Sequence, residues 1–140
     1  MSSFAQTSDA RRNPLTVVGG VLAVIVAASA VNAVVAVIAR AVADKPDDFG
    51  PLDPGSYIFL TAVGVILGAV GWAVVRRASK RPAELLHKLV PAVIVVSFVP
   101  DFFLFGDGGA AGVIALLVMH VAVATIAVPV FRRVMPLTTR

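Results

Sequence analysis

The chain has 140 residues, of which 59% are hydrophobic and 14% charged, and it carries a formal net charge of +4 with no cysteine. A soluble domain has about a quarter charged residues and just under half apolar ones, so this composition indicates a membrane protein. The lack of cysteine excludes disulfides, thiolate metal sites, iron–sulfur clusters and thiol redox chemistry. The basic excess does not indicate nucleic-acid binding, because the basic residues gather at the ends of apolar segments, as membrane topology requires.

Four apolar segments are long enough to be membrane spans, since a spanning helix takes about 20 mostly apolar residues. They lie at residues 15–39, 56–75, 85–105 and 110–131. The sequence GDGG (106–109) predicts a tight turn between the third and fourth segments. We therefore predict an all-α, polytopic membrane protein. Its membrane domain (15–131) is an up-down-up-down four-helix transmembrane bundle between a short N-terminal tail (1–14) and a basic tail (132–140).

The first segment has some features of a signal peptide. Arg11 and Arg12 precede it, and the residues ASA at 28–30 resemble a cleavage site. However, the apolar run continues to Ala39, which is too long for the apolar region of a signal peptide. We therefore expect an uncleaved transmembrane helix.

Lysine and arginine are unevenly distributed between the two sides that alternating spans define. Of the 12 such residues, two (Arg40 and Lys45) lie in the loop 40–55. The other ten lie in the two tails, in the loop between the second and third segments and, in the case of Lys88, at the start of the third segment. Because cytoplasmic loops carry the excess of basic residues, both termini are predicted to be cytoplasmic. The predicted localisation is the cell membrane, as a multi-pass protein.

Aromatic residues lie toward the ends of the segments. Trp72 and Phe131 lie toward the predicted cytoplasmic boundary, and Tyr57 and Phe59 lie toward the opposite one. This placement is typical of the aromatic belts at membrane–water interfaces.

The second segment has a stripe of small residues. Gly64, Gly68 and Gly71 are spaced at i, i+4 and i+7, so they share one helix face. Small residues at this spacing let two helix backbones approach closely in lipid. We expect the stripe to pack within the chain, because four helices must first bury one another, and a dimer seam is the alternative. A similar small patch in the first segment is formed by Gly19, Gly20, Ala23 and Ala27.

Every segment carries a polar side chain in the half near the loop 40–55, at depths counted from about 1.5 Å of rise per residue. Asp101 and Thr61 lie about 7 Å deep, Asn32 about 10 Å and His120 about 15 Å. Ser97 lies one turn deeper than Asp101 on the same face. An aspartate at the bilayer centre costs roughly 2.5–3.5 kcal/mol, so such groups face the protein interior. We therefore predict that these five residues form one polar cluster inside the bundle, with His120 deepest.

The roles of Asp101 and His120 stay open at this point. Asp101 could cap its helix or accept a hydrogen bond from Asn32, and His120 could be a neutral residue bonded across helices. Alternatively, the two could form a proton relay. Their axial offset of about 8 Å leaves open whether they touch directly or through water. Pro100 predicts a kink beside the carboxylate, because proline has no amide hydrogen for the Val96 carbonyl.

From about Thr16 to Phe131, the chain resembles the small four-helix actinobacterial-type integral membrane proteins grouped as a family of unknown function. The resemblance rests on SAVNAVVA (29–36), the acidic proline-rich loop, VPDFFLF (99–105) and VMHVAVA (118–124). It implies the four-helix architecture and transfers no activity.

Three kinds of function are compatible with these features. The first is a non-enzymatic bundle or accessory subunit that packs against a membrane protein partner or forms a homo-oligomer. The second is a small proton-coupled transporter or transporter subunit that uses Asp101 and His120. An intramembrane enzyme ranks last, because the sequence contains no serine–histidine pair, metal-ligand cluster or phosphate loop. We therefore expect a non-enzymatic protein in the lipid bilayer, with no catalytic residue, no metal, no cofactor and no nucleic-acid partner.

Overall fold

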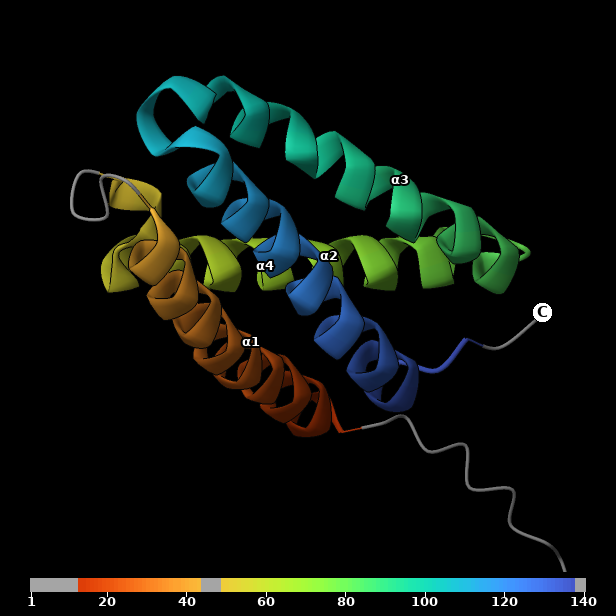
Figure 1. Ribbon diagram of the computed structural model, residues 1–140. Helices are drawn as coiled ribbons and strands as arrows, with labels where there is room; N and C mark the ends of the chain where they lie inside the picture. Colours follow the sequence, from red (N-terminus) through yellow and green to blue (C-terminus); the bar gives the residue numbers. More distant parts are fainter. Residues whose placement is uncertain (1–12, 44–48, 138–140) are drawn as a thin grey trace, which may run out of the picture.

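The computed structural model describes residues 13–43 and 49–137. It therefore leaves out most of the predicted N-terminal tail, residues 44–48 of the acidic loop and the last three residues of the basic tail. The described chain forms α1 (Pro14–Val42), the short 3-10 helix η1 (Gly50–Leu52), α2 (Pro54–Ala78), α3 (Pro82–Phe103) and α4 (Phe105–Val134) (Figure 1). The four α-helices are each long and apolar enough to cross a membrane, which confirms the prediction of an all-α, multi-pass membrane protein.

Prolines begin three of the four long helices. Pro14, Pro54 and Pro82 each occupy the first helical turn, where the missing amide hydrogen costs nothing and the fixed φ suits the helix. At the start of α1, the side chain of Asn13 accepts a hydrogen bond from the amide of Leu15 at 3.0 Å. The helices extend beyond the predicted spans, because capping and proline set their ends whereas hydropathy marks only the apolar part.

The connection between α3 and α4 differs from the predicted turn at 106–109. Leu104 alone separates the two helices, and its carbonyl accepts hydrogen bonds from the amides of Asp107 (3.1 Å) and Gly108 (2.9 Å), so residues 105–108 are already helical. Gly109 then interrupts α4 with φ 57° and ψ −166°, a conformation that favours glycine. We call Leu104 the α3–α4 junction.

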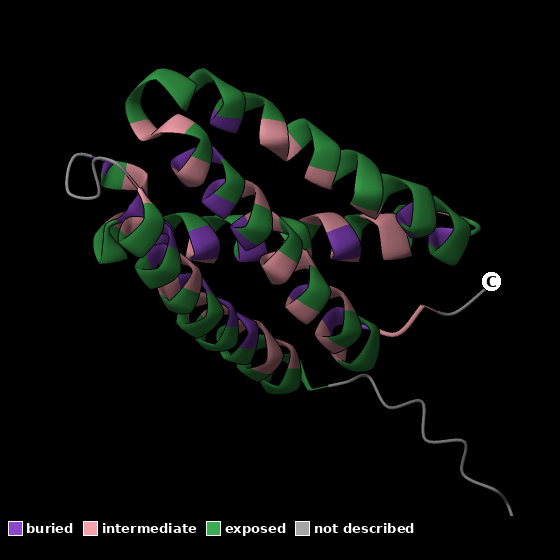
Figure 2. Cartoon of the chain, in the orientation of Figure 1, coloured by how far each residue is buried: buried purple, intermediate pink, exposed green. Residues whose placement is uncertain are grey.

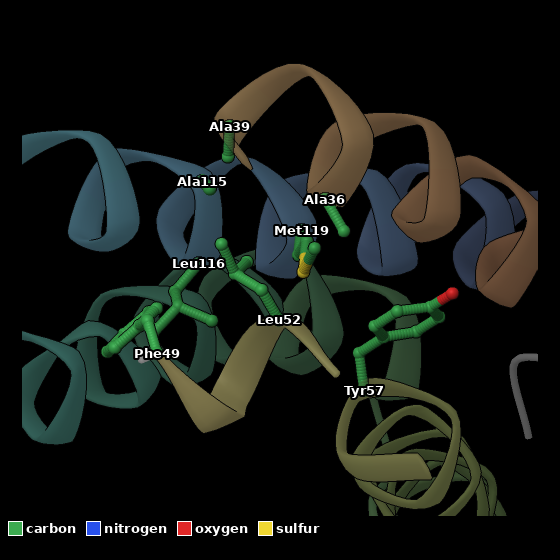
Figure 3. Packing of buried hydrophobic residues seen from close by; sticks show 8 residues of the cluster. All are labelled: Ala36, Ala39, Phe49, Leu52, Tyr57, Ala115, Leu116 and Met119. Carbon is green, nitrogen blue, oxygen red and sulfur yellow. The ribbon is translucent and has the colours of Figure 1, made fainter. Parts of the chain in front are cut away.

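Two apolar clusters form the core. The Phe49 cluster lies near the junction and contains Ala36, Ala39, Phe49, Leu52, Tyr57, Ala115, Leu116 and Met119 (Figure 3). The Trp72 cluster lies toward the other end and contains Val24, Val65, Trp72, Leu86, Ala127, Phe131 and Met135. α1 packs most extensively against α4. α3 is the least buried helix, since only 11% of its most apolar 18-residue stretch is buried inside the protein (Figure 2).

Trp72 and Phe131 belong to this core rather than to the membrane interface. Each is 3% exposed, and their rings meet edge to face with centroids 5.9 Å apart. The indole Nε1 of Trp72 donates to the carbonyl oxygen of Met135 at 3.0 Å, which satisfies its one polar group. Their assignment to an aromatic belt is therefore wrong, since this pairing encloses both rings.

The glycine stripe of α2 packs within the chain at one position only. A Cβ atom added to Gly68 would lie 3.6 Å from the ring of Phe131 on α4, whereas at Gly64 and Gly71 it would meet nothing within 4 Å. The expected intrachain packing is thus found at Gly68 and not at the other two. The buried stripe of α2 instead runs through Tyr57, Thr61, Val65 and Trp72. The glycine stripe lies beside that stripe on the helical circumference, so it reaches α4 only at Gly68.

Candidate functional site

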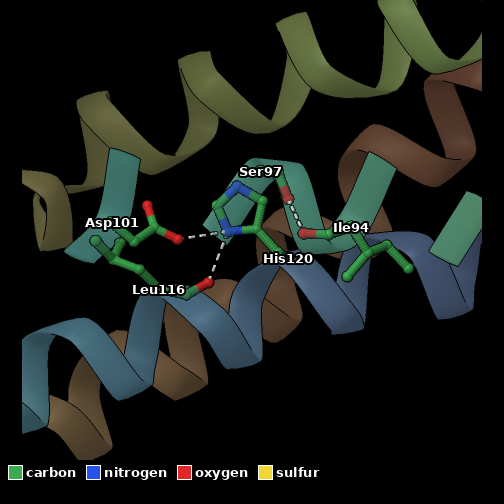
Figure 4. A network of polar contacts seen from close by, with 5 residues as sticks. All are labelled: Ile94, Ser97, Asp101, Leu116 and His120. Carbon is green, nitrogen blue, oxygen red and sulfur yellow. Dashed lines mark hydrogen bonds and ion pairs between the residues drawn. The ribbon is translucent and has the colours of Figure 1, made fainter. Parts of the chain in front are cut away.

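Asp101 and His120 are in direct contact across the α3–α4 interface. Asp101 is 6% exposed, and its Oδ2 lies 3.1 Å from Nδ1 of His120 (Figure 4). The same Nδ1 lies 2.9 Å from the carbonyl oxygen of Leu116, one turn earlier on α4. The structure therefore provides the direct contact that the sequence left open.

The contact is closer than residue counting suggests because of side-chain direction. In an α-helix the Cα–Cβ bonds tilt toward the N-terminus. α3 ends and α4 begins at the junction, so the side chain of Asp101 leans away from the junction and that of His120 leans toward it. The two side chains therefore lean toward each other, which shortens the axial offset of about 8 Å that was counted from the predicted turn at 106–109.

The neighbours of His120 Nδ1 indicate where its hydrogen lies. Both are oxygen atoms, a carbonyl and a carboxylate, so with Asp101 ionised Nδ1 carries the hydrogen and donates to Leu116. In the neutral imidazole Nε2 is then an acceptor. Oδ2 of Asp101 is buried and receives no aligned hydrogen bond, so its main partner is the imidazole beside it. The pair can accept a proton and keep the resulting positive charge next to a carboxylate.

The two members of the pair differ in accessibility. The side chain of Asp101 is 9% exposed, whereas that of His120 is 38% exposed. His120 stacks edge to face with Phe98, at 6.1 Å between ring centroids. Phe98 also lines an open groove between α3 and α4, together with Leu117, Val118, Val121 and Ala122. The acid is thus enclosed, and the imidazole lies next to an apolar groove on the surface of the bundle.

Asn32 and Thr61 form a second polar pair. Nδ2 of Asn32 on α1 donates to Oγ1 of Thr61 on α2 at 2.9 Å, and the residues are 2% and 5% exposed. Asn32 Oδ1 is buried without a hydrogen-bond partner, as is Oγ of Ser29 one turn earlier on α1. Among the described residues no hydrogen bond or ion pair links this pair to Asp101. The structure therefore divides the predicted cluster into two pairs.

Ser97 does not share its hydroxyl hydrogen with either pair. Its Oγ donates to the carbonyl oxygen of Ile94 in the same helix at 2.7 Å (Figure 4). α3 continues through Pro100 to Phe103, so the proline does not end the helix beside the carboxylate. The polar character of this part of α3 thus comes mainly from Asp101.

The polar pairs lie between the two apolar clusters. On α1, Asn32 follows Val24 of the Trp72 cluster and precedes Ala36 of the Phe49 cluster. On α4, His120 directly follows Met119 of the Phe49 cluster, and the Trp72 cluster begins at Ala127. Asn32 and His120 thus lie between the two clusters along their helices, where a polar group needs a partner within the protein, whereas Asp101 lies near the junction.

The described residues do not bring together three or more histidine, cysteine, aspartate or glutamate side chains as metal ligands. His87 is exposed on α3. Among the described residues, the candidate site is therefore the contact between the Asp101 carboxylate and the His120 imidazole.

Sequence reasoning missed Phe49, which contacts the backbone of α4 at Gly108 and Gly112. A Cβ atom on these glycines would lie only 2.5 Å and 2.8 Å from the Phe49 ring. The spacing of the two glycines by four residues could have indicated a close approach to α4. This close approach was not predicted, because Gly108 also fits the turn expected at residues 106–109.

A family model matches residues 11–136, a range that includes both polar pairs. No curated protein and no solved structure matches the chain. The match covers nearly the whole chain, and the chain therefore belongs to a family of unknown function, DUF6069.

Proposed function

We propose that this chain is a small, non-enzymatic, proton-coupled transporter or transporter subunit of a bacterial plasma membrane. The observation that carries the proposal is the enclosed carboxylate of Asp101, 3.1 Å from the part-exposed imidazole of His120. Ionisable groups inside membrane spans are costly, and they commonly mark ion pathways and proton relays. A purely structural pair would gain from enclosing both partners, whereas here the imidazole reaches the surface of the bundle.

The proposed chemical step is the reversible protonation of His120. Nδ1 donates its hydrogen to the Leu116 carbonyl, so an incoming proton binds at Nε2. The imidazolium is stabilised by the Asp101 carboxylate beside it. Release of the proton from Nε2 restores the neutral ring, and no bond other than N–H forms or breaks.

The proposed topology is up-down-up-down, with both termini in the cytoplasm. It is supported by the distribution of basic residues, ten on the side of the termini and two in the loop 40–55. A reporter enzyme fused after Arg140 is expected to be active only if the reporter works in the cytoplasm. Activity of a reporter that works only outside the cytoplasm would reject this topology. The bacterial origin is supported by the alanine-, valine- and arginine-rich composition, which suits a high-GC genome.

Infrared difference spectroscopy on the protein in lipid tests the proton site. Changing pH should produce signals from the Asp101 carboxylate and the His120 imidazole in the wild type. Asp101→Asn should remove the carboxylate signal and shift the imidazole signal. The matched control is Asp107→Asn, which removes an exposed carboxylate in the first turn of α4. In proteoliposomes with a pH-sensitive dye inside, Asp101→Asn should likewise reduce the proton flux driven by an imposed gradient. Equal signals and equal fluxes in wild type and Asp101→Asn would reject the proposal.

A second candidate is an accessory bundle that packs against another membrane protein. It is favoured by Gly64 and Gly71, which leave open space on α2 where a partner helix could approach. Because the chain has no cysteine, single cysteines at Gly64 and at Ile66, which is exposed on another face of α2, can be compared by cross-linking in native membranes. Cross-linking at position 64 and not at 66 would support this candidate, and equal yields would count against it.

A further inference from the structure

Phe49 occupies a notch in α4 that exists because two glycines have no side chain. A Cβ atom on Gly108 would lie 2.5 Å from the Phe49 ring, and one on Gly112 would lie 2.8 Å from it. Real Cβ atoms do not approach other atoms so closely, so any other residue at either position would displace the ring. Phe49 is 3% exposed, although it belongs to the segment that connects α1 and α2 rather than to a membrane helix.

The notch lies on the face of α4 that leads to the proton site. Gly112, Leu116 and His120 are spaced by four residues, so they follow one another along one side of the helix. The side chain of Leu116 packs in the Phe49 cluster (Figure 3), and its carbonyl oxygen lies 2.9 Å from His120 Nδ1 (Figure 4). Phe49 therefore covers the junction end of the stripe on which His120 lies.

Asp101 adjoins the same cluster from α3. Its backbone carbonyl accepts a hydrogen bond from the amide of Leu104 at 3.1 Å, and the side chain of Leu104 packs against the Phe49 cluster. Both members of the Asp101–His120 pair are thus one helical turn from residues that contact this cluster. The Phe49 cluster therefore adjoins the pair on both helices.

We propose that Phe49 is a displaceable plug that closes the junction-end route from water to the Asp101–His120 pair. Among the described residues the ring is held by packing, and the Phe49 backbone is bonded within η1, where its carbonyl accepts from the Leu52 amide at 3.1 Å. Phe49 can therefore leave the notch without breaking a hydrogen bond of any membrane helix. The inference rests on the proposed function, because the plug would control proton exchange at the pair. The plug itself is tested separately, by the access of a water-soluble reagent to position 101.

Cysteine accessibility tests the plug, because the chain has no native cysteine. The probe is Asp101→Cys, reacted in proteoliposomes with a charged, membrane-impermeant methanethiosulfonate added on the side of the junction. We expect slow reaction with Phe49 in place and a rate about tenfold higher or more in the Phe49→Ala background, because truncation favours the locally opened state. Gly112→Ala should accelerate the reaction as well, since its Cβ atom displaces the ring. Phe49→Met, which can refill the notch, should restore protection.

Two controls separate a plug from general loosening of the bundle. Phe103→Ala removes a ring that is 82% exposed on α3, and it should leave the rate at position 101 unchanged. A cysteine at Ala127, buried in the Trp72 cluster, should stay protected in the Phe49→Ala background. The plug is rejected if position 101 reacts fast with Phe49 present, if Phe49→Ala does not accelerate it, or if position 127 becomes reactive to the same extent. If access behaves as expected but Asp101→Asn leaves the infrared proton signal intact, the plug stands and the proposed function fails.

Discussion

The two polar pairs of the bundle differ in exposure and in chemistry. Asn32 and Thr61 are 2% and 5% exposed, and neither side chain exchanges a proton near neutral pH. Asp101 is enclosed, but its partner His120 keeps 38% of its side chain exposed, and both groups can bind a proton. The difference teaches that a polar contact between membrane helices acts as a fixed link when both partners are neutral and enclosed. Under the proposed function, the Asp101–His120 contact is instead a site for proton exchange, because its imidazole reaches the surface of the bundle.

The packing of the helices produces this difference. In their most apolar 18-residue stretches, α1 is 22% buried and α4 is 28% buried, compared with 11% for α3. α1 brings Asn32 into the most tightly packed part of the bundle, whereas α3 packs mainly against α4 and leaves a groove along one side. The exposed histidine is a consequence of this one-sided packing of α3.

The largest expected effect comes from placing a carboxylate in the enclosed pair. Asn32→Asp should lower the free energy of unfolding by about 3 kcal/mol, because no cation is available to the new charge. The reciprocal change, Asp101→Asn, should alter it by less than about 1 kcal/mol, because the amide keeps the shape and removes a charge from an enclosed site. Unfolding with sodium dodecyl sulfate in mixed micelles measures both. Similar losses in the two variants would remove the distinction between the pairs.

A smaller loss of stability is expected from a substitution at Gly68 of α2. Gly68→Leu should cost roughly 1–3 kcal/mol, because the added side chain must displace the ring of Phe131. Gly64→Leu on the same stripe should cost less than about 0.5 kcal/mol, because open space surrounds that position. Thermal denaturation in detergent compares the two variants. A loss at position 64 as large as at position 68 would show that the stripe packs as a unit.

Removing the hydroxyl of the enclosed pair should have a modest effect. Thr61→Val deletes the acceptor of the Asn32 amide and should cost about 0.6 kcal/mol, with about 1.7 kcal/mol as the upper end for such bonds in membranes. Thr125→Val is the control, because that exposed hydroxyl bonds only to the carbonyl of Val121 in its own helix. Detergent unfolding curves for both variants decide the outcome. Equal costs would mean that the link between α1 and α2 adds nothing to stability.

The smallest effect is expected at Ser97. Its hydroxyl bonds to Ile94 within α3, so Ser97→Ala should change the free energy of unfolding by less than about 0.5 kcal/mol. It should also leave the infrared signals of Asp101 and His120 unchanged. A shift of those signals would show that Ser97 interacts with Asp101 or His120, and it would favour the single cluster predicted from the sequence.

Hydropathy and proline placement were enough to predict the four helices. The enclosure of Asp101 could be expected as well, because a lone carboxylate in hydrocarbon is too costly. Its partner could not be identified by counting residues, since that count ignores the tilt of side chains toward helix N-termini. The tilt turns the two side chains toward each other, because Asp101 precedes the junction and His120 follows it.

Helix rotation was harder to predict than helix existence. In a membrane, both the core and the lipid are apolar, so hydrophobicity does not indicate which side of α2 faces inward. The buried stripe through Tyr57, Thr61 and Val65 is polar at only one position, and the neighbouring glycine stripe gives an equally plausible inward face. Phe49 escaped notice for a different reason. Its burial depends on two glycines that lie about sixty residues later in the chain.

The position of Asp101 near the junction also has a mechanical consequence. Asp101 is three residues from Leu104, about 4.5 Å along the helix, whereas Leu86 is eighteen residues away, about 27 Å. If α3 swings about the junction as a rigid lever, Asp101 moves only about one sixth as far as Leu86. A swing that shifts Leu86 by about 5 Å therefore moves Asp101 by less than about 1 Å. The acid and the imidazole stay together while the far end of α3 opens, and distances between spin labels near residues 86 and 101 and a label on α4 would record that ratio.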